Sequence, residues 1–120
     1  MLPDAPRAAR LIDVSHEIAD GLVTYRGLPA PVITDYLTRA AAEQLVRAGA
    51  RLVGIDSLNI DDTADLMRPA HTLLLRAGIP IVEHLCNLAA LPAHGCKFFA
   101  VPVKVKGMGT FPVRAFALVE

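Results

Sequence analysis

The clearest pattern of apolar and polar positions lies in the second half of the chain. Residues 51–56 form an apolar run that ends in a carboxylate, as expected for a buried parallel strand. A polar, acidic stretch follows at 57–68, and a helical pattern then begins with a proline at 69–77 and ends at Gly78. Residues 79–83 are again mostly apolar. This order predicts a β-α-β crossover, which in proteins is nearly always right-handed.

The predicted crossover contains the residues that we expect to form the structural core. Its helix carries three consecutive leucines, Leu73, Leu74 and Leu75, which we expect to pack against the strands. Ile55 lies in the first of these strands. The segment from residue 51 to residue 83 is therefore predicted to be the heart of the fold.

The remaining elements are shorter and are separated by turns rich in glycine and proline. They are a strand at 11–15, an extended piece at 32–37, a helix at 39–48 ending at Gly49, a short helix at 87–91, and strands at 97–105 and 113–119. The sequence thus predicts one α/β domain with a mixed β-sheet and two main helices. We expect this domain to span residues 10–120 and residues 1–9, rich in proline and alanine, to form a flexible tail.

Composition narrows the class of protein further. The 120 residues are 53% hydrophobic, and 12 Lys and Arg balance 12 Asp and Glu. A neutral chain lacks the basic excess that nucleic acid or an anionic membrane would require, and no apolar run approaches the roughly 20 residues that span a bilayer. The N-terminus does not resemble a signal peptide, and two cysteines do not make a disulfide scaffold, so a cytoplasmic protein is expected.

Candidate chemistry gathers at the predicted carboxyl edge of the strands, where open α/β sheets bind ligands. Asp56 and Glu83 each end an apolar strand, and His71 lies near the N-terminus of the intervening helix. One histidine and two carboxylates would suit Zn²⁺ or Mn²⁺. Alternatively, His71 caps its helix and Glu83 pairs with an arginine. Asp61 belongs to the acidic loop, where solvated carboxylates are the ordinary case.

Several segments, taken in order, resemble the cyclase family, the metal-dependent hydrolases that include bacterial kynurenine formamidase. The similar segments are LIDVSHEIADGLVTYRGLP, AAAEQLVRAGARLVGIDSLNIDD, RPAHTLLL with GIPIVEHL, and FFAVPVKVKGMGTFPVRAFALV. His71 and Glu83 stand where this family places its late histidine and glutamate metal ligands. His16 is similar to the histidine of the Ser-His pair on the family's opening strand.

One departure from the family pattern is as informative as the match. The family signature H-x-G-T-H-x-D-x-P-x-x-H supplies the first metal ligands and a catalytic histidine. In this chain Thr38 and Arg39 run directly into the helix at 39–48, and no such motif is present. The resemblance is therefore to a shortened, truncated member, and no residue is assigned a catalytic role.

The resemblance implies a metal-dependent hydrolase of amide C–N bonds. Its activity would be of the arylformamidase type, acting on small molecules similar to N-formylkynurenine in tryptophan catabolism. His71 and Glu83 would be metal ligands, with Asp56, Asp61 and His16 as neighbours of the site. Because catalytic zinc sites have three protein ligands, we expect zinc or manganese to bind weakly and the isolated chain to be impaired.

Two further alternatives follow from the missing segment. The chain is either an inactive remnant or an oligomerising structural subunit, or it represents an incomplete version of a longer enzyme. Loss of the middle strands would expose sheet edges and apolar faces, so we expect a homo-oligomer.

Overall fold

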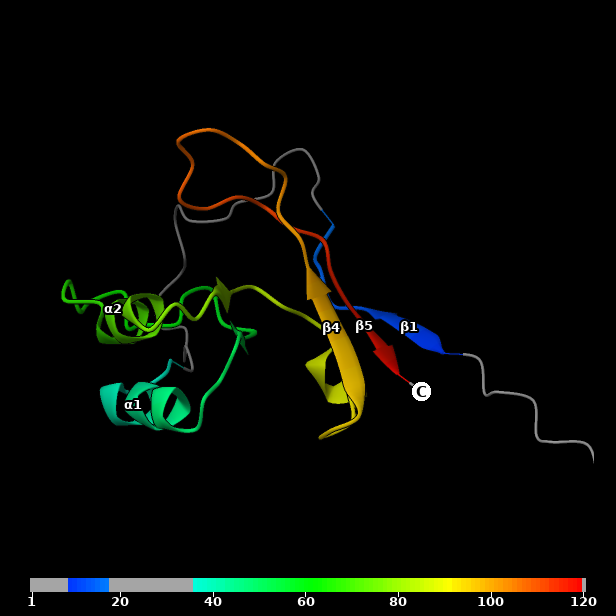
Figure 1. Cartoon of the computed structure of the whole chain (residues 1–120), viewed down its shortest axis with the longest axis horizontal. Coiled ribbons are helices and arrows are strands. Elements are labelled where there is room, and N and C mark those ends of the chain that lie inside the picture. The colour runs from blue at the N-terminus through cyan, green and yellow to red at the C-terminus, as the bar shows by residue number, and fades with distance from the viewer. Residues whose placement is uncertain (1–8, 18–35, 120) are drawn as a thin grey trace, which may run out of the picture. The chain divides into compact units, whose positions relative to one another are not determined.

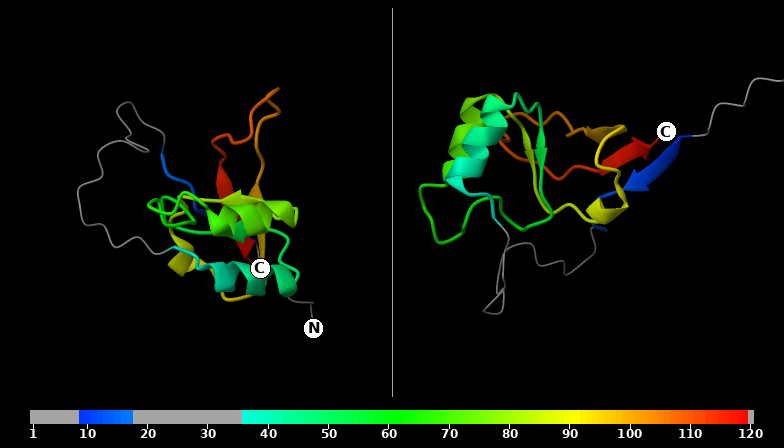
Figure 2. Two further views of the ribbon diagram at one scale, coloured as in Figure 1. Left: turned by 90° about the vertical axis from the view of Figure 1, so that its left-hand side faces the viewer. Right: turned by 90° about the horizontal axis from the view of Figure 1, so that it is seen from below.

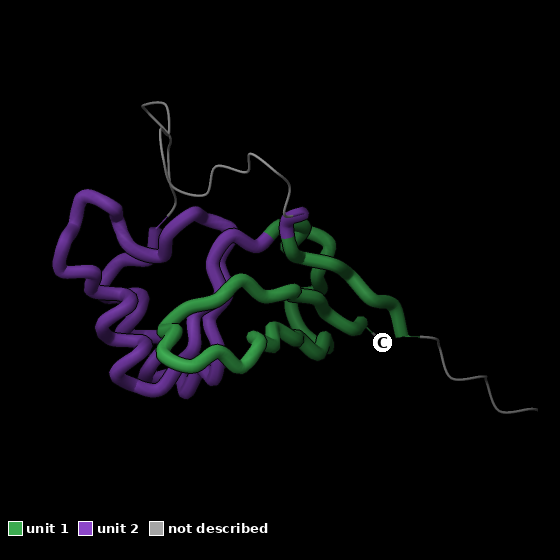
Figure 3. The backbone as a smooth tube through the Cα atoms, turned by 90° about the horizontal axis from the view of Figure 1, so that it is seen from above, with its two compact units in different colours: residues 1–15, 86–120 green, residues 16–85 purple. Residues whose placement is uncertain are grey.

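The computed structural model describes residues 9–17 and 36–119 (Figure 1). Contacts divide the chain into two compact units (Figure 3). Unit 1 combines residues 1–15 with 86–120, whereas unit 2 is the continuous stretch 16–85. The predicted tail, apart from Ala9, lies outside the described residues, as do residues 32–35 of the predicted extended piece.

Unit 2 contains the predicted crossover. Helix α1 spans Arg39–Arg47, strand β2 Val53–Gly54, helix α2 Pro69–Arg76 and strand β3 Ile81–Val82. Strands β2 and β3 pair in parallel, as predicted, although both are shorter than the apolar runs that contain them. The polar stretch between β2 and α2 is a loop, as the sequence indicates.

Local residues account for the ends of both helices. The Thr38 side chain accepts a hydrogen bond from the Ala41 backbone N–H and so caps α1. Gly49 and Gly78 follow the two helices with φ of 75° and 73°, the left-handed conformation that glycine adopts without steric cost. Both helices end where the sequence predicted.

The core of unit 2 lies between the helices, which lie side by side in both views of Figure 2. Its fully or nearly fully buried side chains are Ala42, Ile60, Ala70, Leu74 and Ile79. The prediction that all three leucines face inward is wrong, because Leu75 is 56% exposed. Consecutive helical residues point about 100° apart, so Leu74 faces the core while Leu75 faces solvent.

Unit 1 is built on an antiparallel sheet. Strands β1 (Arg10–Asp13), β5 (Ala115–Val119) and β4 (Cys96–Ala100) pair in that order, with β5 in the centre. A short 3₁₀ helix, η1, spans Leu88–Ala90 and corresponds to the predicted short helix. Val14, Ala115 and Ala117 are buried in this unit, and the rings of Phe99 and Phe116 stack with centroids 5.0 Å apart.

Strands β4 and β5 are shorter than the sequence predicted. The predicted strand at 97–105 stops pairing after Ala100, and the chain runs outside the ladder until Ala115. Pro102 has no backbone N–H and cannot continue the ladder as a donor. Val101 and Val103 are consequently 74% and 66% exposed.

The α/β class with two main helices is confirmed. Parallel and antiparallel pairing both occur, but within the described residues they belong to two separate sheets. No helix among the residues that the structure describes is long and apolar enough to cross a membrane.

Candidate functional site

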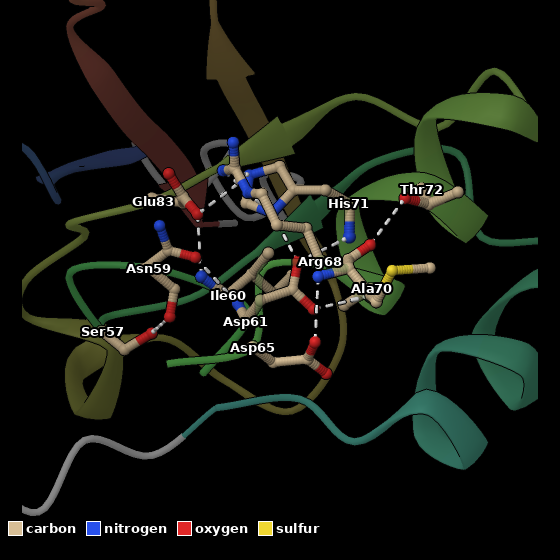
Figure 4. A network of polar contacts seen from close by, with 11 residues as sticks. Ser57, Asn59, Ile60, Asp61, Asp65, Arg68, Ala70, His71, Thr72 and Glu83 are labelled. Carbon is tan, nitrogen blue, oxygen red and sulfur yellow. Dashed lines mark hydrogen bonds and ion pairs between the residues drawn. The ribbon is translucent and has the colours of Figure 1, made fainter. Parts of the chain in front are cut away.

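The polar loop between β2 and α2 folds back on itself and contacts Glu83, the residue that follows β3 (Figure 4). The Asn59 side-chain oxygen accepts a hydrogen bond from the Asp61 backbone N–H at 2.9 Å, and the Ser57 hydroxyl donates to the Asn59 carbonyl at 2.7 Å. These local bonds direct Asp61 away from solvent and toward the start of α2. We call Asp61, Arg68, His71 and Glu83 the His71 cluster.

Asp61 is the buried carboxylate of this cluster, only 3% exposed. It accepts hydrogen bonds from the backbone N–H groups of Ala70, at 2.7 Å, and His71, at 3.0 Å, and so caps α2 from outside the helix. Burial raises the pKa of Asp61, but the hydrogen bonds from His71 and Ala70 lower it by more, leaving this pKa below its ordinary value. Asp61 is therefore ionised at neutral pH.

His71 bridges two carboxylates. Its Nδ1 lies 2.7 Å from Asp61 Oδ2, and its Nε2 lies 3.3 Å from Glu83 Oε1. The same Glu83 oxygen accepts a 2.7 Å hydrogen bond from the Ile60 backbone N–H, which fixes its position. An ionised Asp61 can only accept, so the imidazole Nδ1–H is the donor of the bond between them. Metal-binding histidines are commonly oriented by a carboxylate in this way.

Arg68 is the member that sequence reasoning missed. Its Nη2 lies 3.0 Å from His71 Nε2 and 3.3 Å from Nδ1. The residue occupies the N-cap position of α2 but provides no side-chain cap, and its φ of 43° is left-handed. The available signal was an arginine directly before Pro69, at a position where serine or aspartate is usual.

The structure brings some of the expected site residues together and leaves others apart. His71 and Glu83 meet as the sequence predicted, but the second carboxylate beside them is Asp61. Asp56 is exposed at the end of the β2 region. The alternative in which His71 caps the helix is replaced by an Asp61 cap.

His16 contacts a different histidine. Its ring packs edge-on against that of His84, with centroids 5.7 Å apart. His84 follows Glu83 directly and has a left-handed φ of 61°, so the chain turns sharply after the carboxylate. His16 is thus connected to the His71 cluster through the backbone around Glu83.

The chemistry of the donor set does not by itself fit a catalytic metal centre. His71 Nε2 and the Glu83 carboxylate are two potential ligands, whereas a catalytic zinc site keeps three from protein. Within residues 9–17 and 36–119, no group of three or more His, Cys, Asp or Glu side chains is arranged to hold a metal ion. The described residues therefore supply at most part of such a site.

Comparison with known proteins gives the context for this cluster. No family model matches the chain. It is 41% identical over 73 residues to kynurenine formamidase of Salinibacter ruber, a match that covers 59% of this chain and 33% of the relative. Isatin hydrolase of Roseibium aggregatum is 35% identical over 92 residues, covering 76% and 33%. Kynurenine formamidase of Sphingopyxis alaskensis is 30% identical over 111 residues, covering 86% and 53%.

Solved structures that are similar to this chain include proteins of the same kind as these relatives. Isatin hydrolase A from Ralstonia solanacearum superposes with a TM-score of 0.63 at 33% identity, over 69% of this chain and 34% of that chain. A potential metal-dependent hydrolase with cyclase activity gives a TM-score of 0.62 at 30% identity, over 71% and 41%. The chain spans about a third to a half of the length of the proteins that it matches, which fits a shortened member. Sequence and structure together show that this chain is similar to members of the cyclase family, among them kynurenine formamidases and isatin hydrolases.

Proposed function

We propose that this chain contributes part of a metal-dependent hydrolase site of the arylformamidase type. His71 and Glu83 would be two ligands of a zinc or manganese ion, and the substrate would be a small molecule with an amide C–N bond, similar to N-formylkynurenine. The observation that carries the proposal is the alignment of Asp61, His71 and Glu83: a buried carboxylate orients the imidazole, and its Nε2 faces a second carboxylate.

The rest of the metal shell would come from outside the described residues. A second copy of the chain or another protein carrying the family signature could complete it. The isolated chain would then bind metal weakly and turn over little substrate, because two ligands leave a tetrahedral ion half filled by water.

A second candidate function is that of an inactive, structural subunit. It is favoured by the small donor set, since the described residues offer two ligands where three are usual. In that case the chain would retain the fold of the family and bind partner chains without hydrolysing an amide.

Zinc titration and an assay of N-formylkynurenine hydrolysis separate the two candidates. We expect zinc to bind loosely, to be removed by mild chelation, and to support little or no hydrolysis. His71→Ala should abolish the specific zinc binding because it removes the oriented Nε2. His94→Ala is a matched control, since His94 is exposed and lies outside the cluster.

Three outcomes of this experiment are informative. Tight, stoichiometric zinc with hydrolysis that depends on His71 would show a complete site and exclude the inactive subunit. Zinc binding equal in wild type and His71→Ala would contradict the proposed ligand role. Unfolding on metal removal would show a structural metal instead.

We also propose that this chain self-associates, so that its partners include a second copy of the chain. Strands β1 and β4 form the edges of the three-stranded sheet within the described residues. Leu66 and Met67 of unit 2 are 92% and 81% exposed, and Val101 and Val103 of unit 1 are 74% and 66% exposed. Exposed apolar side chains and open strand edges both favour self-association.

Light scattering over a micromolar concentration series checks this expectation. The measured mass should exceed that of one chain and rise with concentration. A mass equal to one chain at every concentration would exclude a homo-oligomer in this range.

A further inference from the structure

The segment that joins β4 to β5 is a long exposed stretch of unit 1. The strand ladder ends at the pair Ala100 and Ala115, and every residue from 101 to 112 is exposed. Figure 1 shows this segment as the orange loop that leaves β4 and returns to β5. We call residues 101–112 the arm. Because no strand within the described residues pairs with the arm, it is open to another molecule.

The arm combines apolar and basic side chains. Three valines alternate with Pro102, Lys104 and Lys106 along its first half. The large apolar residues of the arm, with exposed fractions from 38% to 74%, are Val101, Val103, Val105, Met108 and Phe111. Lys104 and Lys106 form no ion pair with any residue in the described ranges 9–17 and 36–119. The arm therefore suits a partner surface that is apolar and negatively charged.

Unit 2 carries a surface with these properties. Residues 56–67, which we call the acidic loop, contain four aspartates and no basic residue. Asp61 is buried in the His71 cluster, whereas the other three aspartates reach the surface. Leu66 and Met67 end the loop and are 92% and 81% exposed. The acidic loop thus offers negative charge beside two large, uncovered apolar side chains.

Opposite charges are separated along the chain while the whole chain is neutral. Residues 52–67 contain no Lys or Arg, residues 84–119 contain no Asp or Glu, and the full chain has 12 of each sign. Two neutral copies do not repel each other through their net charge, and a net charge near zero promotes association. An anionic partner of another kind would match the arm alone, whereas a second copy matches both the arm and the acidic loop.

We propose that the arm of one copy docks on the acidic loop of a second copy, an inference that rests on the proposed self-association. The valines of the arm cover Leu66 and Met67, and its two lysines pair with Asp62 and Asp65. Arm and loop are different surfaces, so the contact is heterologous. It closes into a dimer when each copy gives its arm to the other, and a one-way contact extends into a chain of copies.

Charge reversal in the full chain tests the two surfaces separately. The arm variant carries Lys104→Glu and Lys106→Glu, and the loop variant carries Asp62→Lys and Asp65→Lys. Each should weaken self-association at least about tenfold in sedimentation velocity, because attractive pairs become repulsive. An equimolar mixture of the two variants should associate like the wild type, since the arm of each variant then meets a loop of opposite charge.

Controls distinguish the position of these charges from net charge. Arg47→Glu with Arg76→Glu gives the same net charge as the arm variant, but the changes lie in the last turns of α1 and α2. This control should associate like the wild type, and the neutral chain with all four reversals should self-associate again. Circular dichroism checks that each variant is folded. Should the loop variant not fold, Leu66→Ser with Met67→Ser replaces it, since both side chains are exposed, and it should weaken association.

The outcomes also separate this inference from the proposed self-association. An arm variant that associates as tightly as the wild type overturns the arm contact and leaves self-association through another surface. Equal weakening in the arm variant and the arginine control overturns the arm contact as well, because net charge then explains the effect. A wild type that is a single chain at every concentration overturns both proposals, and retention on heparin that depends on Lys104 and Lys106 would then assign the arm to an anionic polymer.

Discussion

Replacing Leu74 with alanine should lower the free energy of unfolding by about 2–5 kcal/mol, the range measured for fully buried leucines. Leu74 is fully buried and belongs to the cluster that holds α1 against α2. The substitution removes apolar surface from the core and leaves a cavity that the surrounding side chains fill only in part. Urea unfolding followed by circular dichroism measures the change.

Leu75→Ala is the matched control for this prediction. It makes the same chemical change one residue later on the same helix, but Leu75 is 56% exposed. Its effect should be within about 0.5 kcal/mol, as is usual for surface substitutions. Equal effects at the two positions would show that α2 is rotated from the orientation described above.

Asp61→Ala should destabilise the protein by about 3 kcal/mol, because three hydrogen-bond donors lose a charged acceptor. The donors are the backbone N–H groups of Ala70 and His71 and the His71 Nδ1–H. The start of α2 would lose its cap, and the imidazole would lose the partner that orients it. Thermal and urea unfolding at neutral pH measure this loss.

Asp65→Ala is the control, since Asp65 is an exposed carboxylate of the same loop and accepts one bond, from the Met67 N–H. Asp65→Ala should lower the free energy of unfolding by well under half as much as Asp61→Ala does. The loss of unfolding free energy in Asp61→Asn should fall between those of the two alanine variants, because the amide keeps one acceptor oxygen but no charge. A loss at Asp61 no larger than that at Asp65 would contradict the capping role.

Much of unit 2 could be predicted from local signals. Pro69 and Gly78 bracket α2, and the apolar runs on either side of it become the two parallel strands. These signals are reliable because the fixed φ of proline and the left-handed φ of glycine act on the chain at those positions alone. The 3.6-residue period also separates Leu74 from Leu75, although a run of three leucines obscures it.

The site was predictable only in part. His71 and Glu83 could be paired because strand ends meet at one edge of a sheet, but the same rule favoured Asp56 over Asp61. The position of Asp61 depends on a local turn stabilised by the Asn59 side chain, which leaves no periodic signature in the sequence. The contact between Arg68 and His71 likewise depends on the conformation of one strained residue.

The pairing of β1 with β5 has a consequence for how this chain folds during synthesis. Arg10 lies opposite Val119 in the β1–β5 ladder, whereas unit 2 is continuous from 16 to 85. At about 5–20 residues per second, β1 would be synthesised roughly 5–20 s before its partner strand. Unit 2 can fold in that interval, since its contacts are closer in sequence. The unpaired β1 would meanwhile be open to capture by a chaperone or by the β5 segment of another copy, a route to a domain-swapped dimer.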